Sequence, residues 1–283
     1  MVTVQTLLTR MYRAVRRVFP QCQIVAEATA YNMFLAFFPI LLLGLGILHG
    51  TKWGASAVLQ MWFRLQIILP PESSHLVGAY LGRHGESALR WILVGLLGTL
   101  LVGARLMTTL TEGFHIVAGD PARPNFWNRQ LRVFTLLCLT IFPWLAVVIL
   151  TIFGRQVTSW LMYETGSSFA IRVALEIGYV VAVFVLGVAV LMIVYRVGRP
   201  GHRGWRDVLH GAVLATLLWW AVDYIFGTYV RHMPYDVVYG GVAAAIGLLV
   251  WMYLTTVVVL FGAAYNAERR AEEPQFPEGP KGC

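Results

Sequence analysis

Five candidate functional side chains are ionisable and lie in stretches that are otherwise apolar enough to be buried in lipid. A charge inside a bilayer is costly unless it is paired or hydrated, so each marks a candidate path for an ion or a polar substrate. Carboxylate and guanidinium groups in such places can hold a proton, an ion or a polar headgroup, which is binding chemistry without covalent steps. The five are Glu27, Arg105, Glu112, Glu176 and Asp223, and the amide of Asn32 lies close to the first.

Four of these six residues are expected in the inner half of the membrane. They are Glu27, Asn32, Arg105 and Glu112. Glu27 and Arg105 could form an ion pair at the inner mouth of a polar path. Alternatively, Glu27 lies at the headgroup level and is solvated, and the sequence favours neither arrangement.

Asp223 is the acid that we expect deepest in the membrane, on the outer side. At about 1.5 Å per residue it lies roughly 12 Å from the outer end of its helix. Trp219 and Trp220 precede it by one turn, so the surface there is aromatic and acidic, which suits a lipid headgroup but also plain helix packing. Arg172 and Glu176 are four residues apart, a spacing that favours a structural pair.

Other kinds of chemistry find little support in the sequence. The seven histidines form no HxH or HxxxH pair, and the cysteines, Cys22, Cys138 and Cys283, are far apart. Metal-dependent phosphodiester cleavage needs converging carboxylates or histidines outside the bilayer, but the four aspartates are dispersed. We therefore expect no metal, no cofactor and no enzymatic activity, with a ribonuclease as the least favoured class.

The composition predicts an all-α integral membrane protein. Hydrophobic residues make up 58% of the chain and charged residues only 13%, against about 25% charged in soluble proteins. A membrane helix needs about 20 apolar residues. Six segments meet this requirement: 24–48, 88–110, 131–153, 173–196, 207–230 and 239–265.

The basic residues predict the orientation of these six helices. With the N-terminus inside, 15 of the 22 Arg and Lys residues fall on the inner side, so both termini are expected in the cytoplasm. The net charge of +8 comes mainly from arginines at the ends of apolar runs, which argues against a nucleic-acid partner. The expected location is the bacterial inner membrane.

Three regions outside the spans have distinct patterns. Residues 1–23 read as a basic amphipathic helix on an anionic membrane surface, or as an ordinary positive flank of the first span. In the outer loop, 50–88, residues 54–69 are expected to form an interfacial helix, although a re-entrant or seventh span competes. The membrane domain covers 24–268, and the proline-rich tail, 269–283, is expected to be disordered.

Proline and small residues predict how the helices bend and pack. Pro39 and Pro143 should kink the first and third spans and free carbonyls that could line a cavity. Small residues four apart let helix backbones approach closely. Three such pairs occur: Gly46 and Gly50, Gly211 and Ala215, and Ala243 and Gly247.

Three segments resemble the YihY/BrkB family of bacterial inner-membrane proteins, once labelled ribonuclease BN. The first is AYNMFLAFFPILLLGLGI, and the second is VYRVGRPGHRGWRDVLHGAVLATLLWWAVDYIFGTYV. The third and most specific is VYGGVAAAIGLLVWMYLTTVVVLFGAAYNAE, with its Tyr-Gly entry, Trp-x-Tyr centre and Gly-Ala-x-x-Asn exit. The chain departs from the family where His115 replaces the usual Asn and where the acid of the fifth span is displaced to Asp223.

The resemblance implies a membrane protein without settled biochemical activity. Its members are discussed as transporters or lipid-handling permeases, one branch is linked to serum resistance, and the ribonuclease label is regarded as a misassignment. We therefore expect a protein that moves, or helps move, a lipid or lipid-linked envelope molecule, with membrane lipids as partners. Glu27, Asn32 and Arg105 would form its inner site, and Asp223 its outer one. The competing expectation is a non-transporting scaffold or envelope-integrity protein, which should tolerate Asp223→Asn.

Overall fold

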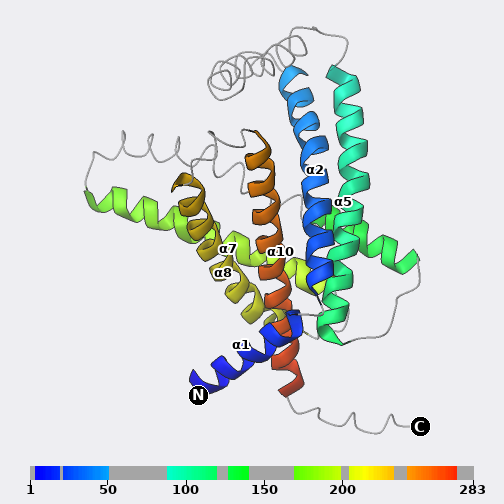
Figure 1. Ribbon diagram of the computed structural model, residues 1–283. Coiled ribbons are helices and arrows are strands. Elements are labelled where there is room, and N and C mark those ends of the chain that lie inside the picture. Colours follow the sequence, from blue (N-terminus) through cyan, green and yellow to red (C-terminus); the bar gives the residue numbers. More distant parts are fainter. Residues whose placement is uncertain are drawn as a thin grey trace, which may run out of the picture. The chain divides into compact units, whose positions relative to one another are not determined.

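The described part of the chain is entirely helical in the computed structural model (Figure 1). It comprises residues 4–19, 22–50, 88–119, 127–139, 169–198, 204–232 and 241–272. The labelled helices are α1 (Val4–Val18), α2 (Gln23–Gly50), α5 (Ala88–Ala118), α7 (Phe169–Gly198), α8 (Trp205–His232) and α10 (Gly241–Glu272), and residues 127–139 are helical as well.

Five of these helices are long and apolar enough to cross a membrane, judged by length and composition. Their candidate spans are Gln23–Gly44, Arg90–Ala118, Ile177–Gly198, Trp205–Val230 and Ala244–Glu272. These confirm five of the six predicted segments. The remaining one, 131–153, is helical as far as residue 139, and the rest of it lies outside the described residues.

The chain divides into two compact units. The first contains residues 1–27, 107–226 and 254–283, and the second contains 28–106 and 227–253. In the first unit the C-terminal half of α10 is the most buried element, because its residues are covered on several sides. Leu260 and Ala264 are fully buried, and the polar residues Asn266 and Glu268 are only 3% and 6% exposed.

Small residues set the distance between α8 and α10 in the first unit. A Cβ atom added to Gly211 would lie 2.2 Å from the carbonyl oxygen of Gly262. One added to Gly262 would lie 2.7 Å from Cβ of Ala215 and 2.4 Å from the hydroxyl of Tyr195. The predicted packing role of Gly211 and Ala215 is therefore confirmed. In each of the other two predicted pairs one residue, Gly50 or Ala243, has surroundings that lie outside the described part.

Tyr195 fastens α7 to α10. Its buried hydroxyl donates a hydrogen bond to the carbonyl oxygen of Val259 at 2.8 Å, and its ring packs edge-on against Phe114 of α5, with centroids 5.6 Å apart. The next residue, Arg196, holds its guanidinium over the ring of Trp205, 4.5 Å from the centroid, and so joins the end of α7 to the start of α8. These contacts join three helices around α10.

The second unit contains a close contact between α2 and α5. A Cβ atom on Gly95 would lie 2.6 Å from the backbone nitrogen of Leu43, and one on Gly98 would lie 2.8 Å from Cβ of Pro39. Pro39 lies inside α2, as predicted, and cannot donate a hydrogen bond to the carbonyl four residues earlier. The kink expected there stays a prediction, and Pro143 lies outside the described residues.

The C-terminal end of the membrane domain differs from the sequence prediction, because α10 extends into the predicted disordered tail. Within the predicted N-terminal helix, 1–23, the structure has α1, and the tail predicted to be disordered, 269–283, is helical up to Glu272. The reason is that acidic side chains in the last turns of α10 pair with arginines of α1, as described below. The outer loop with its predicted interfacial helix, 54–69, lies outside the described residues, as does the rest of the tail.

Candidate functional site

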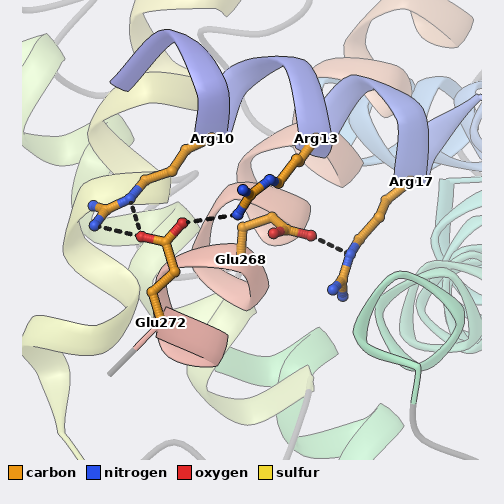
Figure 2. Close-up of polar contacts among 5 residues, drawn as sticks. All are labelled: Arg10, Arg13, Arg17, Glu268 and Glu272. Atoms are coloured by element: carbon orange, nitrogen blue, oxygen red, sulfur yellow. Dashed lines mark hydrogen bonds and ion pairs between the residues drawn. The ribbon is translucent and has the colours of Figure 1, made fainter. Parts of the chain in front are cut away.

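Arginines of α1 and glutamates of α10 form a cluster of opposite charges in the first unit (Figure 2). Glu272 binds two arginines: its Oε2 accepts from Nε and Nη2 of Arg10 at 2.8 and 2.7 Å, and its Oε1 accepts from Nη1 of Arg13 at 3.1 Å. Glu268 pairs with Nε of Arg17. We call these five residues the arginine–glutamate cluster.

The two glutamates of the cluster lie in different environments. The Glu268 side chain is only 7% exposed, whereas that of Glu272 is 34% exposed. Arg17 also donates from Nη1 to the carbonyl oxygen of Val117, at 3.2 Å, so it binds α5 and α10 together. A buried carboxylate depends strongly on its partner because water cannot replace it.

Matching helical spacings create the cluster. Arg10, Arg13 and Arg17 follow one another at three and four residues, and Glu268 and Glu272 at four, so each set lies on one helix face. Partial burial lowers the pKa of the Arg10 guanidinium, but the hydrogen bond and charge of Glu272 outweigh this and raise that pKa overall. The sequence predicts these arginines as topology signals and as part of a basic amphipathic helix, and it assigns them no carboxylate partner, although the complementary spacing is visible.

Asn266 is a second polar link that sequence reasoning did not assign. Its Oδ1 accepts a hydrogen bond from the backbone N–H of Gly211 at 2.8 Å, and its Nδ2 donates to the carbonyl oxygen of Val208 at 3.2 Å. Because both partners belong to α8, one buried amide joins two membrane helices. The available signal is the Gly-Ala-x-x-Asn exit of the last span, because its final residue is Asn266. The family resemblance assigns this asparagine no contact.

The residues of the predicted inner site are spread over both units. Glu27 belongs to the first unit and is exposed, whereas Asn32 and Arg105 belong to the second. The pairing of Glu27 with Arg105 therefore stays a prediction. Glu112 forms an ion pair with Arg129, and both side chains are substantially exposed, at 50% and 39%. The predicted pair of Arg172 and Glu176 lies outside the described side chains.

Asp223 is exposed on the surface of α8, and its predicted functional role stays a prediction. One turn earlier, the ring of Trp220 packs edge-on against Phe184 of α7, with centroids 5.3 Å apart. The Nε1 of Trp219 is buried and finds no hydrogen-bond partner among the described residues. The same holds within the described residues for the buried Oγ1 of Thr255, whose residue is 5% exposed.

The register between α8 and α10 indicates that Trp219 and Thr255 lie at the same level along the two helices. Gly211 contacts Gly262, and Asn266 bonds back to Val208, so α8 and α10 run antiparallel. Continuing that register by two turns, at about 3.6 residues per turn, places Trp219 at the level of Thr255. Two buried polar atoms thus lie at one level, a turn before Asp223. Each would cost about 1–3 kcal/mol in a dry interface.

The described helices bring no metal-ligand set together. Within them, no three His, Cys, Asp or Glu side chains are arranged so that they could hold a metal ion. The first unit contains the arginine–glutamate cluster and the Asn266 amide that joins α8 to α10. It also contains two buried polar atoms, Trp219 Nε1 and Thr255 Oγ1, which we call the polar level, about one turn from the exposed carboxylate of Asp223. These arrangements can bind and orient polar groups.

Comparison with known proteins gives a consistent class of relatives. A family model described as "Virulence factor BrkB" matches residues 18–281. A UPF0761 membrane protein of Aromatoleum aromaticum is 26% identical, over 92% of this chain and 62% of its own length. One from Idiomarina loihiensis is 27% identical over 74% of this chain and 72% of its length. A Bacillus subtilis protein whose name calls it ribonuclease-like is 25% identical over 61% of this chain and 63% of its own length.

The length covered limits what these relatives imply. The chain spans 62%, 64% and 53% of the lengths of the three relatives given first, so those proteins contain further sequence. No solved structure matches the chain. The names of the two UPF0761 relatives describe membrane proteins and state no activity, and the Bacillus subtilis name says only that the protein is ribonuclease-like.

Proposed function

The chain belongs to the Virulence factor BrkB family, whose matching relatives are named as membrane proteins, and from this premise we propose that it moves, or helps move, a lipid or lipid-linked envelope molecule across the bacterial inner membrane. It would do so as a multi-pass protein that binds its substrate without covalent chemistry. Membrane lipids would be its partners, and neither a cofactor nor nucleic acid would be needed.

The proposed topology has six membrane helices and both termini in the cytoplasm. Five candidate spans support it, together with the helical residues 127–139 at the start of the predicted third span. An odd number of spans would put the termini on opposite sides. The excess of arginines on the inner segments argues against that arrangement.

The observation that carries the proposal is the polar level of α8 and α10. An exposed carboxylate in a lipid-facing position is unfavourable, so Asp223 favours a hydrated environment. The buried donors of Trp219 and Thr255 at the neighbouring level would each be satisfied by water or by a polar headgroup. A polar substrate would reach these buried donors only where α8 and α10 separate, and it would meet the carboxylate of Asp223 one turn further.

The inner site would comprise Glu27, Asn32 and Arg105. Arg105 would offer a positive charge to a headgroup phosphate, and the carboxylate and amide would accept and donate hydrogen bonds. Glu112 is already paired with Arg129, so it would take part only if that exposed pair opens. Exposed ion pairs are worth about 0–1 kcal/mol, so opening would cost little.

A lipid-movement assay in proteoliposomes tests the proposal. A fluorescent headgroup-labelled phospholipid is incorporated, and dithionite quenches the outer leaflet only. We expect wild-type protein to extend quenching beyond the outer-leaflet fraction and Asp223→Asn to abolish the extra quenching. Asp207→Asn is the matched control. It makes the same chemical change on the same helix, and asparagine can still cap α8 where Asp207 accepts from the N–H of Gly204 at 3.0 Å.

The competing function is a membrane scaffold or envelope-integrity protein. It would need the arginine–glutamate cluster for shape but not a charge at position 223. Quenching that is identical in protein-free, wild-type and Asp223→Asn vesicles would count against lipid movement and favour the scaffold.

A further inference from the structure

Helix α1 has two faces with opposite surroundings. On one face Ala14 and Val18 are buried at 0% and 2% exposure. The same side carries the three arginines of the arginine–glutamate cluster, so it is occupied by α10 and by the end of α5. Figure 2 shows these arginines directed from α1 toward the glutamates of α10.

The opposite face of α1 is aromatic, apolar and exposed. Tyr12, Val15 and Phe19 are 63%, 42% and 47% exposed, and Arg16 lies among them with its guanidinium 6.0 Å from the centre of the Tyr12 ring. These positions follow at three and four residues, so they form one stripe along the helix. An exposed stripe with several large apolar side chains is unusual on a surface that faces only water.

The chain holds this stripe next to the first membrane span. The N–H of Cys22 donates to the carbonyl oxygen of Val18 at 3.0 Å, and the N–H of Ala26 donates to that of Cys22 at 2.8 Å. Only four residues separate α1 from α2, whose candidate span begins at Gln23. Because α1 is not among the candidate spans, its outward face can meet the bilayer only at the interface.

We infer that the stripe of Tyr12, Val15, Arg16 and Phe19 inserts into the headgroup–acyl boundary of an anionic bilayer, and that its apolar side chains, rather than the arginines of α1, provide the attachment. The sequence alone predicts a basic amphipathic helix on an anionic membrane surface, or an ordinary positive flank of the first span, and does not say which side chains would make the attachment. In the structure Arg10, Arg13 and Arg17 pair with carboxylates, whereas Arg16, the fourth arginine of α1, has no carboxylate partner in the described part of the chain. Arg16 would therefore be the residue that meets a lipid phosphate.

The inference does not depend on lipid movement, and it has a distinct salt dependence. Between about 0.1 M and about 1 M salt the screening length falls from about 10 Å to about 3 Å, which weakens exposed charge attraction but not apolar insertion. A helix held by its arginines should leave the bilayer over this range. A helix held by the stripe should stay.

Fluorescence quenching in lipid nanodiscs tests this on the full chain. Val15→Cys, in a background with the three native cysteines replaced, carries an environment-sensitive fluorophore, and the nanodiscs contain phosphatidylglycerol with acyl-brominated phosphatidylcholine. We expect strong quenching that changes by less than about twofold over the salt range of the preceding paragraph. Changing both Tyr12 and Phe19 to Ser should remove most of it, whereas Arg16→Gln should remove little.

Two results would overturn the inference. Quenching that disappears at high salt, or that Arg16→Gln alone abolishes, would show attachment by charge. Absence of quenching at every salt concentration would mean that another segment or a second copy of the chain covers the stripe. The Ser variants leave the cluster residues intact, and size-exclusion elution and melting temperature verify that they remain folded.

Discussion

Replacing Glu268 by Gln should destabilise the protein more than the same change at Glu272. Both substitutions remove one negative charge from α10 and preserve the shape of the side chain. They differ in environment, because the Glu268 side chain is 7% exposed and that of Glu272 is 34% exposed. Glu268→Gln leaves Arg17 facing a neutral amide.

The expected magnitude follows from the contacts of each pair. After Glu268→Gln the charged guanidinium of Arg17 can still donate to the amide oxygen, but it has lost its counter-charge at a partly buried site. Leaving a buried polar group unsatisfied costs about 1–3 kcal/mol, so the partial loss here should cost about 1–2 kcal/mol. The loss stays below the 3–5 kcal/mol of a fully buried broken pair. Arg17 is 36% exposed and keeps its bond to the carbonyl of Val117. For Glu272→Gln the exposed pairs suggest about 0.5 kcal/mol.

The assay is reversible unfolding in mixed detergent micelles, arranged as two double-mutant cycles. One cycle combines Arg17→Gln with Glu268→Gln, and the other combines Arg13→Gln with Glu272→Gln. We expect a coupling energy of about 1 kcal/mol or more in the first cycle and less than about 0.5 kcal/mol in the second.

Either of two results would refute this reasoning. One is a coupling in the first cycle that falls within the additivity error of about 0.3–0.5 kcal/mol. The other is a larger loss of stability for Glu272→Gln than for Glu268→Gln. Burial would then not govern how these pairs contribute to the stability of the first unit.

Four further substitutions and one labelling experiment test the packing. Asn266→Ala should lower the unfolding free energy by about 1–3 kcal/mol, since it removes two interhelical hydrogen bonds. Asn266→Asp keeps the acceptor but buries a carboxylate whose oxygen faces the carbonyl of Val208, so it should cost at least as much. Gly262→Ala should cost about 1–3 kcal/mol in the same unfolding assay because its Cβ would overlap Tyr195, whereas Gly44→Ala, which meets nothing within 4 Å, should cost nothing measurable. Burial raises the pKa of the Cys22 thiol, so the reactive thiolate forms only at higher pH than in the unfolded chain. A variant retaining only Cys22 should resist N-ethylmaleimide until detergent unfolds it, and rapid labelling of the folded protein would contradict this burial.

The site was less predictable than the helices, and particular residues show why. Asn266 lies in the segment of the last span that resembles the family, but its hydrogen-bond partners, Gly211 and Val208, lie 55 and 58 residues away in sequence. Glu112, predicted on a substrate path, pairs with Arg129, and the sequence did not predict this partner. Helical spacing identifies which side chains share a face, but not which helix lies opposite.

The sequence by itself determined the positions of five membrane-length helices, the amphipathic α1 and the close-packing role of Gly211 and Ala215. These features follow from local composition and helical period, because lipid acts on each segment separately. Only the tertiary structure decided that Arg17 pairs with Glu268, that α10 continues to Glu272, and that α1 turns its arginines inward and its aromatic stripe outward. Arg17 and Glu268 stand near opposite ends of the chain, and complementary charges pair only where folding makes their helices neighbours.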